Sequence, residues 1–156
     1  MLIFIDTEFT DLRAPQLISV GLVAEDGREF YAERADVPLE ACTPFVRREV
    51  LPLLGDPAAR RDCDAIARDL RRWLAPYAAR PTAIAFDDDR DWLLFYRLLR
   101  THLPLTISGL PMGGAICREA YEDFFLQPGM RRHHALHDAR ANRHAYRAHA
   151  RPALSA

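Results

Sequence analysis

The chain contains no lysine. Its 21 positively charged side chains are all arginine, against 22 Asp and Glu in 156 residues, and the formal net charge is −1. The overall positive charge that often marks nucleic-acid-binding proteins is therefore missing, although a local basic groove beside an acidic site would average to the same value. Any phosphate contact would have to come from arginine, histidine or backbone N–H groups, and arginine suits bidentate phosphate contact.

Cysteine is scarce, and long apolar runs are missing. Cys42, Cys63 and Cys117 are odd in number and show no C-x-x-C spacing, which argues against a disulfide framework and against a zinc knuckle. The apolar run at the N-terminus is too short for a signal peptide or a membrane span, and no other run is long enough. We therefore expect a cytoplasmic protein without membrane contact.

The alternation of apolar segments predicts an α/β fold. Five segments predict strands: residues 2–5, 16–24, 29–32, 82–86 and 105–110. Four predict helices: residues 62–75, 92–100, 118–125 and 136–148. Strands followed by alternating helices and strands imply a mixed sheet flanked by helices. Without repeats or linkers, we expect one domain at residues 1–150 and a short tail at residues 151–156.

Three local features refine this outline. Asp26-Gly27 between two apolar runs predicts a hairpin turn, and Gly21 within a strand marks either a bulge or a close backbone approach. Residues 36–57 predict irregular structure with at most a short helix near residues 45–50. On the helix at residues 62–75, we expect the arginines to form a solvated face: Arg68, Arg71 and Arg72.

Two acids follow the first apolar run, in MLIFIDTEFT. Alternate side chains of an extended backbone share a face, so Asp6 and Glu8 project together from the end of a buried strand. Two close carboxylates repel each other, and a divalent cation such as Mg²⁺ or Mn²⁺ would remove the repulsion. The alternative is a solvated turn that happens to contain two acids.

Further acids follow at two other places. Four of the five residues from Asp87 to Asp91 are acidic and follow the strand TAIAF. A helix cap explains one aspartate there but not four. Asp138 lies near the start of the last helix, beside several histidines. Because sites in such sheets form at strand ends, these acids could converge into a two-metal site for phosphoryl transfer.

These motifs resemble a known family. DTEF, an acid that starts a helix in the middle of the chain, and HHALHDA near the end resemble the three motifs of DEDDh-type 3′–5′ exonucleases, which have a ribonuclease H-like fold. Relatives include ribonuclease T and oligoribonuclease. Residues 17–23 and the turn Leu51-Pro52-Leu53 resemble a small bacterial exoribonuclease branch of that family.

The resemblance implies roles for individual residues. Asp6, Glu8 and Asp138 would bind the metal ions, and His133 would be the general base. The ordinary pKa of a histidine, near 6.5, suits a general base. His134 and His137 have no catalytic role in the family pattern, so we expect them at the surface or in contact with phosphate.

The middle motif is ambiguous, because the family usually has an aromatic residue directly before its aspartate and an asparagine a few residues earlier. Phe86-Asp87 matches the first feature. Asp91 matches better by spacing, since it opens a helix and places Phe95 one turn on. We choose Asp91 as the fourth metal ligand, with Asp87 in reserve.

The resemblance implies a metal-dependent 3′–5′ exonuclease that uses two Mg²⁺ or Mn²⁺ ions and releases nucleoside monophosphates. The expected partners are single-stranded RNA or 3′ overhangs, and a homodimer is left open. A DNA-directed exonuclease of repair or proofreading type is the alternative. A second alternative is a non-catalytic nucleic-acid-binding module, which the loss of one of the acids would indicate.

Overall fold

The computed structural model describes residues 1–149, with side chains described to residue 146. The predicted tail and the domain end at residue 150 lie outside the described residues. A six-stranded sheet forms the centre of the molecule, in the order β4-β3-β2-β1-β5-β6. Its strands are β1 (Leu2–Phe9), β2 (Leu17–Ala24), β3 (Glu29–Arg34), β4 (Arg60–Arg61), β5 (Thr82–Phe86) and β6 (Ile107–Pro111). The sheet is mixed, because β1, β2 and β3 are antiparallel whereas β5 runs parallel to both β1 and β6.

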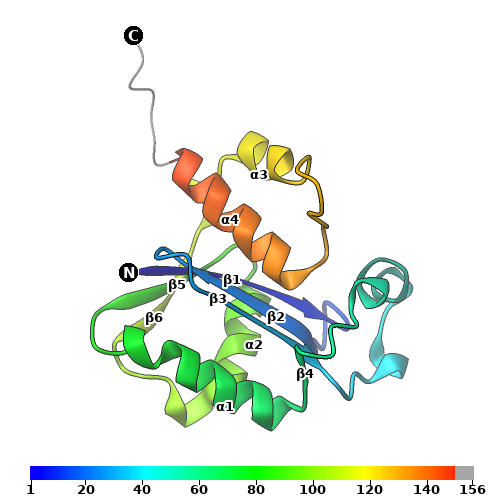
Figure 1. The fold of residues 1–156 in the computed structure, drawn as a ribbon. Helices are drawn as coiled ribbons and strands as arrows, with labels where there is room; N and C mark the ends of the chain where they lie inside the picture. The colour runs from blue at the N-terminus through cyan, green and yellow to red at the C-terminus, as the bar shows by residue number, and fades with distance from the viewer. Residues whose placement is uncertain (150–156) are drawn as a thin grey trace.

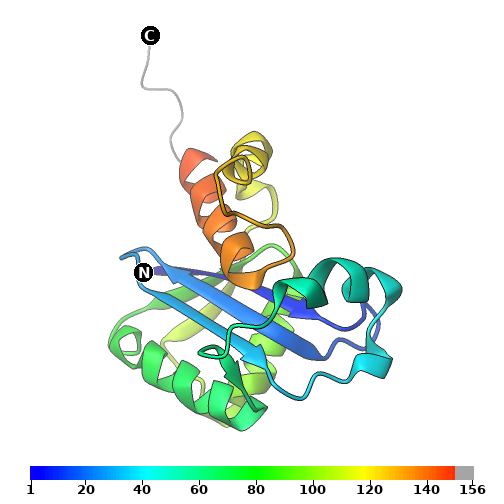
Figure 2. The same cartoon turned by 45° about the vertical axis from the view of Figure 1, so that its right-hand side comes forward.

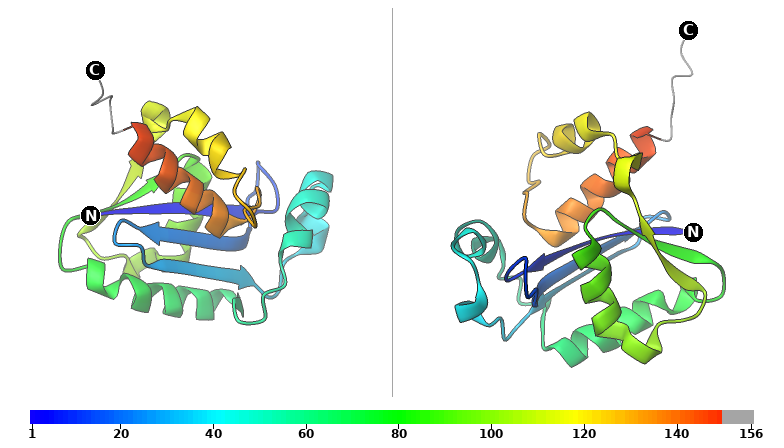
Figure 3. Two further views of the ribbon diagram at one scale, coloured as in Figure 1. Left: turned by 45° about the horizontal axis from the view of Figure 1, so that its top comes forward. Right: turned by 180° about the vertical axis from the view of Figure 1, so that it is seen from behind.

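Helices cover both faces of the sheet. The four α-helices are α1 (Cys63–Leu74), α2 (Asp89–Leu99), α3 (Arg118–Phe124) and α4 (Ala135–His149). Figure 1 shows α1 and α2 below the sheet and α3 and α4 above it; the rotated views of Figures 2 and 3 show the same layers. Among residues 1–149, no helix combines the length and the apolar character needed to cross a lipid bilayer.

Short helical segments of 3₁₀ or π type fill several connections. They are η1 (Leu39–Ala41), η2 (Val46–Val50), η3 (Leu51–Leu53), η4 (Ala75–Tyr77), η5 (Arg100–His102) and η6 (Gly113–Ala115). The first three form a lobe beside the C-terminal end of β1 (Figure 2). The lobe is anchored by a small cluster of Ile18, Cys42, Val46 and Val50.

The main core lies between the sheet and the α1–α2 layer. The strands contribute fully buried side chains such as Ile3, Ile5 and Ile84. From the helices, Leu70 and Phe95 enter the same cluster. Burial of each large aliphatic side chain stabilises the fold by roughly 1.5–3 kcal/mol. This packing fixes β1 and α2 relative to each other, and both carry predicted site residues.

The α/β class, the mixed sheet and the flanking helices are confirmed, and so is the turn at Gly27, whose φ is +91°. Two boundaries were wrong by more than two residues. The first strand continues to Phe9 instead of ending near Ile5, so Asp6 and Glu8, which we expected at its end, lie within β1. The predicted helix at residues 92–100 begins at Asp89, because Asp88 caps it. The two-residue strand β4 was missed.

Candidate metal and active site

The predicted acids come from three elements that meet at the C-terminal end of β1. Asp6 and Glu8 lie on β1, Asp91 lies in the first turn of α2, and Asp138 lies in the first turn of α4. Asp87 comes from the link between β5 and α2. In keeping with the alternation of a strand, Asp6 and Glu8 each offer an oxygen within 4.8 Å of the other.

The acids form two groups of three that share one member. Asp6, Glu8 and Asp138 each offer an oxygen within 4.8 Å of the other two, and the same holds for Asp6, Asp87 and Asp91. We call these the first and second triads. Both open into one pocket of about 520 Å³, which His133 also lines. The structure thus brings together all five predicted site residues and the reserve residue Asp87.

Burial and mutual repulsion make the acids unusually weak. Desolvation is the main reason that the pKa of Asp6 lies well above its ordinary value, and Asp91, Asp138 and Glu8 add repulsion. Desolvation likewise raises the pKa of Glu8 to about 8, of Asp91 to about 8 and of Asp138 to about 6. Within the part of the chain whose side chains are described, no basic side chain forms an ion pair with any of these carboxylates. A cluster of uncompensated oxygen donors is the environment that hard divalent cations prefer.

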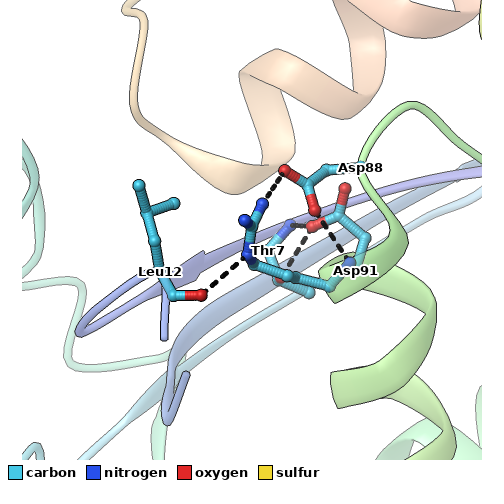
Figure 4. Close-up of polar contacts among 5 residues, drawn as sticks. Thr7, Leu12, Asp88 and Asp91 are labelled. Atoms are coloured by element: carbon cyan, nitrogen blue, oxygen red, sulfur yellow. Dashed lines mark hydrogen bonds and ion pairs between the residues drawn. The ribbon is translucent and has the colours of Figure 1, made fainter. Parts of the chain in front are cut away.

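Asp91 is held by the residue between the two β1 acids. Its Oδ1 accepts hydrogen bonds from the Thr7 backbone N–H (2.9 Å) and from the Thr7 hydroxyl (2.6 Å), and only 2% of the residue is exposed. Figure 4 shows this contact beside Asp88, which accepts from the Arg90 backbone N–H as the cap of α2. Neither Asp87 nor Asp91 is therefore the cap, and both remain available to the second triad.

Three further residues orient the other carboxylates, and two of them, Tyr121 and Asn142, were not singled out from the sequence. Tyr121 donates its hydroxyl to Asp138 (3.1 Å), and the His134 backbone N–H donates to the same carboxylate (2.9 Å). Asn142 donates its amide to Asp87 (3.0 Å). Asn142 follows Asp138 by four residues on α4, so helical spacing could have indicated it, whereas nothing in the sequence links Tyr121 to Asp138.

A glycine brings α4 against the sheet. Gly21 of β2 pairs with Asp6 of β1, and a Cβ at Gly21 would lie 2.4 Å from backbone atoms of Ala135 and Leu136. The predicted close backbone approach is therefore confirmed, and it is made by the start of α4. Because Asp138 follows within one turn, this contact sets Asp138 beside Asp6.

His133 lies on the loop before α4, as predicted. Its φ of +63° is in the left-handed region, which is uncommon for residues other than glycine. The ring makes an edge contact with Phe45 of the lobe, with centroids 5.0 Å apart. Desolvation lowers the pKa of His133, so the imidazole is neutral near pH 7 and able to accept a proton.

The neighbouring histidines His134 and His137, which we expected at the surface or in contact with phosphate, are half-buried. The His134 ring stacks between Tyr31 (4.6 Å) and His137 (4.1 Å). Desolvation lowers the pKa of His137 to about 4, and its neutral Nδ1 accepts a hydrogen bond from the Arg131 backbone N–H. The stack braces the loop that carries His133. Contact of these histidines with phosphate stays a prediction.

The fold and the site together define an α/β protein with a buried acidic centre suited to divalent cations. Two curated proteins of Mycobacterium tuberculosis resemble part of this chain: the 3′–5′ exoribonuclease Rv2179c of strain H37Rv and the 3′–5′ exoribonuclease MT2234.1 of strain CDC 1551. Each is 45% identical over 74 residues, which are 46% of this chain and 44% of the relative. The chain thus matches less than half the length of these relatives. No family model matches it.

Proposed function

We propose that this protein is a metal-dependent 3′–5′ exonuclease of ribonuclease H-like fold, with a single domain at residues 1–150, and that RNA is its substrate. The observation that carries the proposal is the pair of acid triads that share Asp6 and open into the pocket of His133. The mixed sheet with helices on both faces is consistent with that fold. The names of the two partial relatives support the exoribonuclease activity.

The residues present fit a pair of Mg²⁺ or Mn²⁺ ions. Asp6, Glu8 and Asp138 would hold one ion, and Asp6 with Asp91 would hold the other, with Asp87 as the reserve ligand. Bound divalent cations would neutralise the acids and stabilise the negative charge that develops on a phosphodiester during hydrolysis. Thr7, Tyr121 and Asn142 would keep the carboxylates turned toward the ions through the hydrogen bonds described above.

The chain's own chemistry is a proton transfer. His133, neutral at pH 7, takes a proton from the water that attacks the phosphorus of the terminal phosphodiester. The bond from phosphorus to the 3′-oxygen of the preceding nucleotide breaks, and that oxygen takes a proton from solvent. The products are a nucleoside 5′-monophosphate and an RNA shortened by one nucleotide with a free 3′-hydroxyl. General base catalysis of this kind contributes roughly 10²–10⁴-fold in rate.

Digestion of a 5′-labelled RNA strand tests the proposal. With Mg²⁺ or Mn²⁺, the wild type should produce a ladder that shortens from the 3′ end together with nucleoside 5′-monophosphates, and a circular RNA of the same sequence should survive. Asp6→Asn removes the carboxylate that both triads share and should be inactive while melting as one folded species. Cleavage of the circle would make the protein an endonuclease and reject the proposal.

The same assay separates the alternatives. Matched single strands and duplexes of RNA and DNA, compared by kcat/KM, distinguish an exoribonuclease from a DNA-directed exonuclease of repair type. A protein that binds RNA with Mg²⁺ and Mn²⁺ but releases no mononucleotide from any of the four substrates would be a non-catalytic binding module.

A further inference from the structure

A second pocket lies in the α1–α2 layer, at the opposite end of α2 from Asp91. It is open, measures about 590 Å³ and lies between α1 and the C-terminal end of α2. We call it the arginine pocket, because the basic residues that line it are Arg68, Arg71, Arg97, Arg100 and His102. Asp64 is the one acid among its lining residues.

The four guanidinium groups form no ion pair within the described part of the chain, although many other arginines of the chain are paired. The solvated face expected for α1 holds for Arg68 and Arg72, which are exposed, whereas Arg71 is half-buried. Uncompensated arginines around a pocket form a site for anions, and planar guanidinium groups suit phosphate oxygens.

Helix α2 runs from the acidic pocket, which Asp91 lines, to the arginine pocket, which Arg97 and Arg100 line. Asp91 lies in its first turn, and Arg100 directly follows its last residue. At a rise of 1.5 Å per residue the two positions are about 14 Å apart along the helix axis, the length of about four stacked nucleotides. A strand held in the acidic pocket by its 3′ end could therefore reach the arginine pocket with its upstream part.

Exposed apolar side chains lie along this path. Leu93 and Tyr96 are 37% and 50% exposed, and helical spacing places them on the same face as Arg97 and Arg100. The Tyr96 ring rests against Trp92, with centroids 6.3 Å apart. An exposed aromatic ring beside arginines is the combination that single-stranded nucleic acids use, with bases on the ring and phosphates on the cations.

We propose that the arginine pocket binds the sugar-phosphate backbone of an RNA strand upstream of the 3′ end that occupies the acidic pocket. This inference rests on the proposed function. It assigns to the chain a second contact with its substrate, which only strands long enough to span α2 can use. Long RNA therefore binds more tightly than a trinucleotide, and the difference resides in the arginine pocket.

Binding to RNA in the inactive Asp6→Asn background tests this contact. The double substitution Arg68→Gln and Arg97→Gln removes two exposed cations whose side chains form no hydrogen bond with the side chains or backbone of residues 1–146. It should weaken binding of a fluorescent twelve-nucleotide RNA about tenfold and lower the salt dependence of log K by about 1.4, because each phosphate contact of a single strand contributes about 0.7. Binding of a trinucleotide should not change.

The control removes two exposed cations that do not line the pocket, by Arg72→Gln and Arg80→Gln; unlike the two pocket residues, Arg72 forms an ion pair, with Asp69 (3.3 Å). If both double variants weaken the long RNA equally, overall charge explains the effect and the proposal is overturned. It is also overturned if the pocket variant binds long RNA like the parent while inorganic pyrophosphate raises the melting temperature of the parent alone, since the pocket then takes a free anion.

Cleavage by the active protein separates this inference from the proposed function. A wild type that digests neither the trinucleotide nor the long RNA rejects the exonuclease activity itself. A wild type that digests both, with a pocket variant of unchanged kcat/KM on the long strand, leaves the activity intact and rejects the arginine pocket as a substrate contact. The expected result is a loss of kcat/KM confined to the long strand.

Discussion

His133 combines a chemical role with an unfavourable backbone. A left-handed φ costs an ordinary L-residue roughly 1–2 kcal/mol, and glycine avoids that cost. The chain places histidine there nonetheless, in edge contact with Phe45 and at the mouth of the acidic pocket. Strain of this kind at a pocket is typical of a functional residue.

His133→Ala and His133→Gly form a matched pair, because both remove the imidazole and only glycine suits the backbone. Both should lower kcat by roughly 10²–10⁴ and leave Mn²⁺ affinity, measured by calorimetry, near that of the wild type. The glycine variant should be about 1 kcal/mol more stable to urea than the alanine variant. Equal loss of Mn²⁺ binding in both would make His133 a ligand instead of the base.

The two candidates for the middle motif differ in how firmly they are held. Asp91 is buried and fixed by Thr7, whereas Asp87 is exposed and contacts Asn142. Asp91→Asn should therefore abolish turnover, because it leaves a neutral and weaker donor in the second triad. Asp87→Asn should be mild. The measurement is activity beside a melting curve, and an inactive, folded Asp87→Asn with an active Asp91→Asn would reverse the assignment.

At the scale of elements, the contact between β2 and α4 assembles the site. Gly21→Ala would place a methyl group against the backbone of Ala135 and Leu136, and backbone cannot move aside as a side chain does. We expect a loss of at least about 1–3 kcal/mol in the free energy of unfolding. Because α4 would shift away from β1, kcat should fall as well.

Gly114→Ala is the control for this substitution. Nothing lies within 4 Å of a Cβ at Gly114, and its φ is not positive, so stability and activity should stay near wild type. Full activity in Gly21→Ala would mean that α4 tolerates displacement and that the site is less tightly assembled than the contact implies.

The elements differ in how much of them the sequence could predict. Alternation along β1 correctly placed Asp6 and Glu8 on one face, but the strand was ended too early because its last residues include acids that look like a turn. The sequence did not show which residue caps α2, because four of the five residues from Asp87 to Asp91 are aspartates and any of them could cap a helix. Local patterns identify such elements. The proximity of Asp138 to Asp6 depends on a long-range contact at Gly21. From the sequence alone, this glycine indicated either a bulge or a close backbone approach.

At the scale of the whole molecule, the negative charge of the buried acids should destabilise the folded protein when no metal ion is bound. The folded-state pKa values of about 8 for Glu8 and Asp91 and about 6 for Asp138 exceed the ordinary values of 4.5 and 3.8. The folded state therefore binds these protons more tightly than the unfolded state. The resulting stability is complete below about pH 4 and is lost as pH rises through 6 and then 8.

Melting in the presence of a chelator should show this loss, with a shallower decline for Asp91→Asn because one repelling charge is gone. Adding Mn²⁺ should raise the melting temperature more at about pH 8.5 than at about pH 6, since protons compete with the cation for the carboxylates. A pH-independent effect of Mn²⁺ would indicate that the ion binds elsewhere on the protein.

Asp6 belongs to both triads, so cations in the two positions would be thermodynamically linked. A first ion fixes the shared carboxylate and neutralises part of its charge, and this changes the affinity of the other site for the second ion. Linkage requires the second to change the affinity of the first by the same factor. A titration should therefore depart from two independent sites, and Asp6→Glu, which moves the shared oxygens while keeping the charge, should alter both binding constants together.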